Sequence, residues 1–377
     1  MAAARKPSRG TANHDPIAQR RVRNERETPR IEHHQGTPVK FFSSIVSRVL
    51  ILGALSLLAA STASAQQTLL NASYDVSREF YKEYNSAFAK YWKQKTGQDV
   101  VVNQSHDGSS KQARSVADGL EADIVTMNSA NDIDFLASRG IVPADWAKKF
   151  PNNAAPTYST MLFLVRKGNP KGIKDWDDLA KPGVQVIIVN PKTGGNGRYS
   201  YMGAWGYAKK KGMSDADTAA FVGRILKNVP VLDTGGRGAT TTFLQRGIGD
   251  VLVTFESEVV QIDREFGVGK VDPVYPSISV LAENPVAVID RVVDKKGTRA
   301  LATAYLEYLY SDEAQEIAAK HYLRVRSPKI AAKNAAVFKP IQLFTVDEMF
   351  GSWKEAQQKH FNDGGEFDKI YSTIGKK

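Results

Sequence analysis

Residues 184–201 read VQVIIVNPKTGGNGRYSY, and this stretch decides the fold class. Its first part predicts a strand over 184–191. Three glycines follow among residues 194–197, and a helix is expected over 199–210. A strand that runs through a glycine loop into a helix is the repeating unit of an open, mainly parallel α/β sheet.

The same alternation extends along the chain on both sides of this unit. The early strands are predicted at 68–74, 99–106 and 122–128, and the early helices at 77–97, 108–120 and 131–140. From about Ser159 the pattern restarts, with strands at 160–170, 184–191, 229–233, 250–256 and 284–292. The accompanying helices are predicted at 175–183, 199–210, 214–228, 238–249 and 296–321, the last with a break near Ser311. We therefore predict an α/β protein with two lobes, each a doubly wound, mainly parallel sheet.

Composition excludes several classes of protein. The net charge is +11, but the first 65 residues hold ten of the 51 Lys and Arg residues and only four of the 40 Asp and Glu residues. The remainder is close to neutral, which argues against a nucleic-acid partner. The chain has no cysteine, so disulfides, thiolate metal sites and cysteine nucleophiles are excluded.

The first 65 residues have the pattern of a leader. Residues 39–65 are predicted to be a secretory signal peptide, because an apolar run from Val49 to Ala60 follows Lys40 and Arg48 and precedes Ala63-Ser64-Ala65. The mature chain would then begin near Gln66. An uncleaved anchor is the alternative, although the run is short for a membrane span. Residues 1–38 are polar and basic, and we expect a disordered leader or a start assigned upstream of the true one.

Three polar loops are expected at the carboxyl ends of strands, each directly before a helix. They are SHDGSSK (105–111), NPKTGGNGR (190–198) and DTGGRGAT (233–240). Unpaired N–H groups in the first turn of a helix bind anions, and glycine allows the backbone to approach a ligand closely. Ser109 could add its hydroxyl to its N–H. The three loops together predict an anion site in the cleft between the lobes.

The glycines could instead belong to a nucleotide-binding motif or to plain turns. No window matches the G-x-x-x-x-G-K-[ST] phosphate loop, and the segment after the first strand lacks the G-x-G-x-x-G of a dinucleotide fold. The glycines could also be turn residues without a ligand. Matching strand–loop–helix context at two glycine clusters and at the serine loop favours the anion site.

The motifs identify a family. The chain resembles the periplasmic sulfate/thiosulfate-binding proteins, the solute receptors of the bacterial sulfate ABC importer, from about residue 69 to 370. The resemblance rests on SYDVSRE, QSHDGSSKQA, FLVRKGNP, NPKTGGNGRYSYMGAWGYA, DTGGRGATTTF, RGIGDVLVTFESEV, YLYSDEAQEIAA and FTVDEMFGSW. It implies a type II periplasmic-binding-protein fold, with residues 66–158 plus 286–325 in one lobe and 159–285 plus 326–377 in the other.

The resemblance also implies a site. Family members hold the dehydrated anion by hydrogen bonds alone, without salt bridge, metal or cofactor. The implied ligand-binding residues are Ser109, Gly194, Gly195, Asn196, Gly236 and Phe255, and residues that support them are Asp75, Arg237, Arg198 and Ser110. The implied partners are a sulfate or thiosulfate anion and an inner-membrane permease with its ATPase. The receptor is expected to be a monomer in the periplasm.

Two positions depart from the family pattern. The family commonly has serine at the position of Gly194, so one hydroxyl donor is missing. The sulfate-specific branch has a tryptophan, which donates its indole N–H, at the position of Phe255. The sequences of both motifs are closer to those of the thiosulfate-binding branch. The terminal sulfur of thiosulfate is a poorer hydrogen-bond acceptor than oxygen.

An enzyme is the competing class, and a binding protein for another oxyanion such as molybdate is a further alternative. An enzyme acting on a small phosphorylated or sulfated substrate would need an acid–base or nucleophilic pair in the cleft. The acidic pair Glu256 and Glu258 is expected on a solvated helix face, and His106 is expected to bond to backbone. The three histidines of the mature chain are scattered, which disfavours a metal site. We predict a binding protein and no enzyme.

Overall fold

The computed structural model describes residues 66–266 and 269–375. The leader predicted over 1–38 and the signal peptide predicted over 39–65 lie outside these residues. In the described ranges, no helix combines the length and the apolar character needed to cross a membrane.

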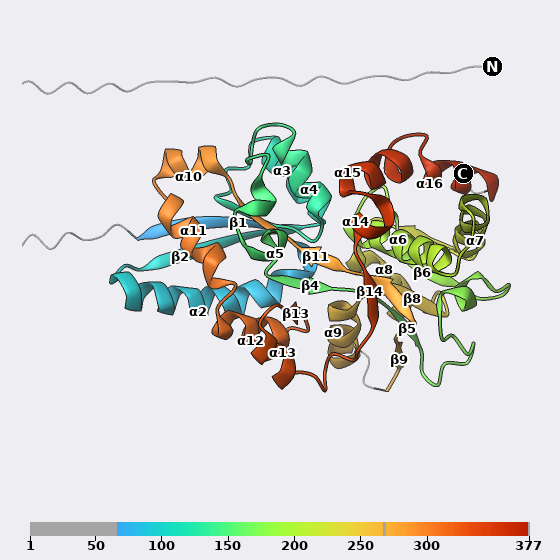
Figure 1. Cartoon of the computed structure of the whole chain (residues 1–377). Coiled ribbons are helices and arrows are strands. Elements are labelled where there is room, and N and C mark those ends of the chain that lie inside the picture. The colour runs from blue at the N-terminus through green and yellow to red at the C-terminus, as the bar shows by residue number, and fades with distance from the viewer. Residues whose placement is uncertain (1–65, 267–268, 376–377) are drawn as a thin grey trace, which may run out of the picture. The chain divides into compact units, whose positions relative to one another are not determined.

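The first sheet has the strand order β12-β3-β1-β2, and Figure 1 labels β1 and β2. The bounds are Gln67–Tyr74 for β1, Val100–Asp107 for β2, Ile124–Thr126 for β3 and Val286–Val288 for β12. β2 and β3 run parallel to β1, whereas β12 is antiparallel to β3. Tyr74 is in register with Asp107, and Ser73 with Thr126, so the three parallel strands end at one edge. The loops that follow these strands are therefore neighbours.

Helices cover both faces of the first sheet because side chains alternate along its strands. Leu69 of β1 packs with α2 (Arg78–Thr96), α11 (Arg299–Tyr308) and α12 (Asp312–Lys320). Ala72 of the same strand packs on the opposite face with α3 (Ser109–Ala117) and α4 (Ala130–Ala137). Each face thus has its own apolar core, and the helices that follow β2 and β3 lie on the same face.

The second sheet has the order β7-β6-β8-β5-β9. Its bounds are Met161–Arg166 for β5, Val186–Val189 for β6, Leu232–Asp233 for β7, Val251–Phe255 for β8 and Val271–Val274 for β9. β6 is parallel to β7 and β8, but β5 is antiparallel to β8 and β9. The sheet is therefore mixed rather than mainly parallel. The chain enters β5 directly from a short strand, and a strand entered without a crossover helix is free to run in the opposite direction.

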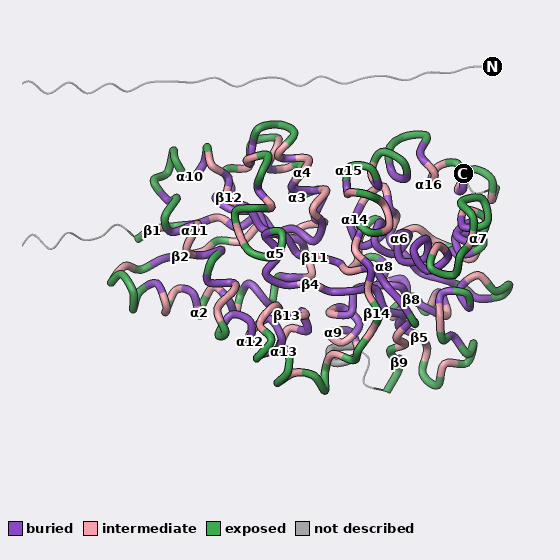
Figure 2. The backbone as a smooth tube through the Cα atoms, viewed as in Figure 1, coloured by how far each residue is buried: buried purple, intermediate pink, exposed green. Residues whose placement is uncertain are grey.

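Both faces of the second sheet are buried as well (Figure 2). One face packs against α6 (Gly195–Lys210), α7 (Asp215–Lys227) and α16 (Glu366–Thr373). The other packs against α8 (Gly236–Leu244) and α9 (Glu256–Phe266). The predicted two-lobed α/β architecture is confirmed.

Short strands connect the two large sheets. They are β4 (Thr157–Ser159), β10 (Ile278–Val280), β11 (Ala282–Asn284), β13 (Arg324–Val325) and β14 (Gln342–Phe344). They form a sheet of order β11-β4-β13 and the pair β10-β14. The chain passes almost directly from β4 into β5 and from β11 into β12, so these strands carry it from one large sheet to the other (Figure 1).

The remaining elements are short. The helices are α5 (Pro151–Ala154), α10 (Asp290–Lys296), α13 (Pro328–Lys333), α14 (Val346–Phe350) and α15 (Trp353–Ala356), followed by a π-helical turn at Gln357–Phe361. Three 3₁₀ turns occur at Asp75–Ser77, Trp146–Lys148 and Trp176–Ala180. The backbone of Asn152 and Asn153 in α5 is left-handed, with φ of 55° and 58°.

Several predicted boundaries were wrong. The strand predicted over 284–292 ends at Val288, and α10 begins at Asp290. The helices predicted from residues 199 and 238 begin earlier, at Gly195 and Gly236. Glycine disfavours a helix interior, so propensity argued against including these residues. The break predicted near Ser311 is confirmed, since Ser311 caps α12 by accepting from the Ala314 N–H.

The glycines of α6 fix how this helix packs. A methyl group on Gly206 would overlap the ring of Phe344, whereas one on Gly223 of α7 would lie 3.3 Å from Ile370 Cγ2. We predict that Gly206→Ala lowers the free energy of unfolding by about 1–3 kcal/mol through overpacking. Gly223→Ala, the matched control, should change it by less than about 1 kcal/mol, because the helix preference of alanine opposes a tight contact with Ile370. Urea unfolding measures both, and equal effects of the two substitutions would refute the packing argument.

Candidate functional site

The first part of the site lies where β2 and β3 end. Ser109 is the first residue of α3 and is 2% exposed. Its hydroxyl accepts a hydrogen bond from the Asn128 N–H at 3.3 Å, and Asn128 lies just after β3. Gly108 precedes α3 and offers no side chain to cap the helix. The first turn of α3 therefore keeps N–H groups available beside the Ser109 hydroxyl.

The N-terminus of α6 lies against the same asparagine. A methyl group on Gly195, the first residue of α6, would lie 2.5 Å from Asn128 Oδ1 and 3.5 Å from Ser129 Cβ. Gly194 precedes the helix in an extended conformation and provides no side-chain cap. With Asn128 in this orientation the position has no room for a side chain, and the first turn of α6 lies next to Asn128, whose N–H bonds to Ser109 at the start of α3.

Glu258 joins the third loop to the second. The Asn196 side-chain amide donates to Thr254 Oγ1 at 2.9 Å and to Glu258 Oε2 at 3.0 Å. A methyl group on Gly236, the first residue of α8, would lie 2.6 Å from Glu258 Oε1. The starts of α3, α6 and α8 are thus linked in series, through Asn128 and then through Glu258.

Several polar groups around these helix starts have no hydrogen-bond partner. In the described part of the chain, Asn128 Oδ1, Ser129 Oγ and Arg198 Nε are buried and unpaired. Ser129 precedes α4, yet its side chain does not cap that helix. Buried polar atoms are normally paired, so unpaired ones at converging helix starts indicate a place where a polar ligand binds.

A buried ion pair crosses between the lobes beside this place. Arg198 of α6 donates to Ser110 Oγ at 3.1 Å and lies 3.6 Å from Asp132 Oδ1. Ser110 donates in turn to Asp132 at 2.7 Å. The structure therefore ties α6 of one lobe to α3 and α4 of the other through the predicted supporting residues Arg198 and Ser110.

The other predicted residues lie around the third loop and the core. Asp75 is half-buried after β1; burial raises the pKa of its carboxyl, and the nearby Arg237 guanidinium opposes that rise. Arg237 itself is exposed. Phe255 is buried at the end of β8, and its ring meets Tyr199 edge-on at 5.8 Å between centroids. It presents an apolar ring with no donor.

The expectation of a solvated face for Glu256 and Glu258 was wrong, because both are buried. Glu256 forms a two-pronged ion pair with Arg324, at 2.6 and 2.9 Å. Glu258 is held by Asn196 and Thr254 and has no cation at hydrogen-bond distance among the described residues. Sequence patterns missed Glu258 because an acidic pair at a helix start is ordinarily exposed. His106 is bonded to the Tyr74 carbonyl at 3.1 Å, as predicted.

The chemistry of the site is that of hydrogen-bond donors around a small polar ligand. Within the described ranges, no group of three or more histidines and carboxylates is placed to hold a metal ion. Ionisable side chains around the helix starts include Glu258, Asp75, Arg198, Asp132 and Arg237, which directly follows Gly236. Arg198 and Asp132 lie against each other and Ser110, and Glu258 contacts Asn196 and Thr254. The first turns of the three helices and the Ser109 hydroxyl can supply neutral donors.

Glu258 gives the site a testable pH dependence. Burial raises the pKa of its carboxyl to about 7, and the nearby Asp75 adds to the rise. Because the fold favours the protonated form, this group lowers stability as the pH rises from about 4.5 to about 7. We predict that Glu258→Gln gains up to about 3 kcal/mol over wild type between pH values of about 5 and about 8, measured by urea unfolding.

Glu256→Gln is the matched control for this prediction. It leaves Arg324 without its carboxylate and should destabilise the protein at every pH in that range. A Glu258→Gln variant whose stability tracks wild type with pH would contradict the assignment of a neutral carboxyl to the fold.

Comparison with known proteins places the chain in a family. The pattern of the family described as "Bacterial extracellular solute-binding protein" matches residues 75–324. The thiosulfate-binding protein of Pseudomonas aeruginosa PAO1 is 59% identical over 333 residues, covering 88% of this chain and 98% of that protein. The sulfate-binding protein of Escherichia coli K12 is 53% identical over 321 residues, covering 85% and 98% respectively.

A solved structure agrees with these sequences. The sulfate-binding protein SubI of Mycobacterium tuberculosis H37Rv superposes with a TM-score of 0.71 at 30% identity, covering 79% of this chain and all of that one. These relatives are binding proteins rather than enzymes. The chain belongs to the bacterial extracellular solute-binding protein family, among the relatives of its sulfate- and thiosulfate-binding proteins.

Proposed function

We propose that this chain is a receptor that captures sulfate or thiosulfate between its lobes, at the starts of α3, α6 and α8. The observation that carries the proposal is that two side chains link the three helix starts. Asn128 lies between Ser109 of α3 and Gly195 of α6. Glu258 lies between Asn196 of α6 and Gly236 of α8. Three uncapped helix starts present N–H donors and the positive ends of their dipoles to one place. A dianion fits such a place without a full positive charge in direct contact.

Hydrogen bonds of this kind are sufficient for useful affinity. Each bond from a neutral donor to a charged acceptor contributes about 1.5–3 kcal/mol net. Five or six bonds exceed the ~8 kcal/mol that micromolar binding needs, and desolvation of the anion with lobe closure offsets the surplus. Recognition mainly by donors also disfavours phosphate, because its remaining proton needs an acceptor and the site offers few, Asn128 Oδ1 among them.

The preference between the two sulfur anions rests on two residues. Gly194 and Phe255 bring no side-chain donor. We propose that thiosulfate binds at least as tightly as sulfate, because its terminal sulfur needs no strong donor. The named relatives do not decide this, since in Escherichia coli K12 the sulfate-binding protein is 53% and the thiosulfate-binding protein 49% identical to this chain.

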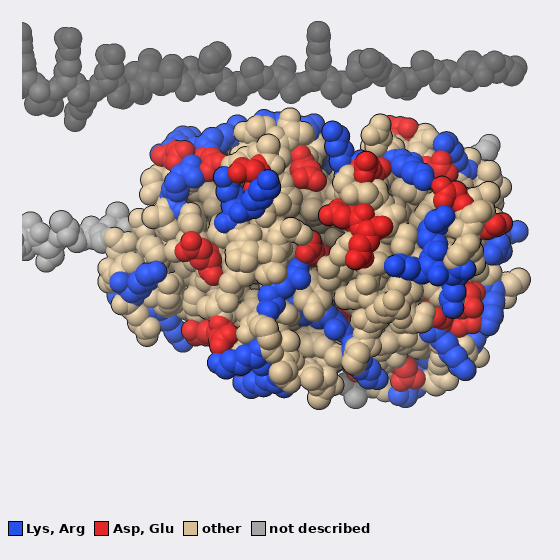
Figure 3. All heavy atoms as spheres, viewed as in Figure 1, with Lys and Arg blue, Asp and Glu red and all other residues tan. Residues whose placement is uncertain are grey.

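The setting of the receptor follows from the same family. We propose that it works as a periplasmic monomer, exported by the signal peptide at 39–65, and delivers its anion to an inner-membrane permease with its ATPase. The family description as extracellular supports export. On the face of the described residues shown in Figure 3, basic and acidic side chains are interspersed.

Titration calorimetry of residues 66–377, the predicted mature chain, tests the proposal. Sulfate and thiosulfate should each form a one-to-one complex, with phosphate at least about 100-fold weaker and molybdate measured in competition. Ser109→Asp should abolish binding by placing a carboxylate against the dianion, whereas Ser115→Asp on the same helix should not. Tight phosphate binding, or sulfate binding retained by Ser109→Asp, would overturn the proposal.

Gly194→Ser tests the origin of the anion preference. A methyl group on Gly194 would lie 3.5 Å from Val189 Cγ1, an ordinary contact, and the backbone φ of −155° accepts any residue. We predict that the added hydroxyl strengthens sulfate binding about 10- to 100-fold, the value of one hydrogen bond to a charged acceptor. Gly194→Ala is the control and should leave sulfate affinity unchanged. Equal gains from both substitutions would show that the hydroxyl does not reach the anion.

A further inference from the structure

A cavity of about 570 Å³ adjoins the proposed anion site. It lies between α8 and α9 of one lobe and the start of α2 of the other. Its lining residues are Val76, Arg78, Glu79, Arg237, Thr240, Thr241, Leu244, Gln245, Glu258, Gln261, Ile262 and Lys270. A volume of this size holds a small organic molecule and far exceeds the needs of an inorganic anion.

The cavity begins at the anion site itself. Glu258, whose carboxylate faces Gly236 and Asn196, is one of its walls, and Arg237 directly follows Gly236. From there the lining follows one side of α8 through Thr240 to Leu244, because residues three and four apart share a helix face. A ligand whose head lies at Gly236 could therefore extend into this cavity.

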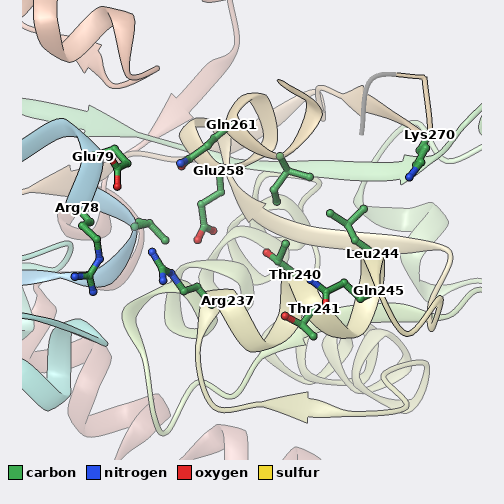
Figure 4. A pocket seen from close by; sticks show the side chains of 12 residues that line it. Arg78, Glu79, Arg237, Thr240, Thr241, Leu244, Gln245, Glu258, Gln261 and Lys270 are labelled. Atoms are coloured by element: carbon green, nitrogen blue, oxygen red, sulfur yellow. The ribbon is translucent and has the colours of Figure 1, made fainter. Parts of the chain in front are cut away.

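The charges of the cavity are unbalanced. Among the residues that the structure describes, Arg78, Arg237 and Lys270 close no ion pair, whereas Glu79 lies 3.9 Å from Lys82 outside the cavity. Glu258 is engaged by Asn196 and Thr254. Figure 4 shows Arg78 and Glu79 on the α2 side, Arg237 beside Glu258, and Lys270 at the far end. The cavity thus offers positive charge on both lobes, with that of Arg237 partly offset by the nearby Asp75 carboxyl.

Its remaining walls suit an organic tail. Val76, Leu244 and Ile262 are apolar, and Thr240, Thr241 and Gln245 add polar groups along α8. The missing side-chain donors at Gly194 and Phe255 also relax the demand for four acceptor oxygens on the head. A head with three oxygens and one carbon or ester substituent satisfies the donors that remain.

We propose that the receptor also binds organic sulfonates or sulfate monoesters that carry a second anionic group. The sulfur head occupies the site at α3, α6 and α8, and the second anion lies between Arg78 of one lobe and Arg237 of the other. This inference rests on the proposed function, because it uses the same head site. Two guanidinium groups from opposite lobes suit a carboxylate, which each can bind through two parallel hydrogen bonds.

The test compares 3-sulfopropanoate with 1-propanesulfonate, which differs by the missing carboxylate, in titration calorimetry at neutral pH and fixed ionic strength. We expect 3-sulfopropanoate to bind at least about 10-fold more tightly, the effect of one charge-assisted hydrogen bond. Arg78→Gln should remove this advantage and leave sulfate affinity within about 3-fold of wild type, since Arg78 does not contact the head site.

Lys90→Gln is the control, because it removes the same charge from the exposed face of α2 outside the cavity. It should leave the advantage of 3-sulfopropanoate intact. Sulfate binding with no binding of 3-sulfopropanoate, equal affinity of the two sulfonates, or an advantage that survives Arg78→Gln would each overturn this inference and leave the receptor function standing. Failure of sulfate and thiosulfate to bind would overturn both.

Discussion

The close approach of backbone to side chain at Gly195 and Gly236 is the constraint on which the site depends. Asn128 Oδ1 and Glu258 Oε1 occupy the space that a methyl group on either glycine would need. With a larger residue at either position, the side chain of Asn128 or Glu258 would have to turn away, and its hydrogen bonds or its contact with the helix start would change. The glycines therefore allow the backbone to approach these two side chains closely, and this approach leaves their N–H groups free to face a ligand.

The two buried glutamates at the start of α9 lie in opposite electrostatic environments. Glu256 is neutralised by Arg324, a contact that ties α9 to β13 across the short connecting strands. Glu258 has only neutral partners, Asn196 and Thr254, so burial raises the pKa of its carboxyl. A second arginine there would bind a sulfur dianion as a salt bridge and bind its competitors as well. Among the described residues Glu258 is held by neutral partners and Arg237 is exposed, so recognition rests mainly on directional donors.

Much of this could be predicted from the sequence. Strand and helix periodicity gave the α/β architecture, and the parallel register of β1 to β3 follows from it, so the loops at Ser109 and Asn128 had to be neighbours. The glycine loops located the other two helix starts to within a few residues, but α6 and α8 begin inside these loops, at Gly195 and Gly236. Asn128 and Glu258 could not be found in this way, because their roles depend on burial between elements far apart in sequence. The antiparallel direction of β5 could not be predicted either, because it depends on the chain passing into β5 directly from the short strand β4.

The polar contacts between lobes set the energetics of capture. Arg198, Ser110 and Asp132 are buried only because α6 lies against α3 and α4, and opening the lobes would return them to water. Closing the lobes removes water from these side chains, and their mutual attraction offsets that desolvation cost only in part, as expected of a buried ion pair. Arg198 Nε, which has no partner among the described residues, adds to that cost. These contacts alone therefore favour closure only weakly, and under the proposed function an anion bound at helix starts on both lobes would supply the difference. A receptor built on these contacts stays responsive, because its closed state depends on the guest rather than on contacts between the lobes alone.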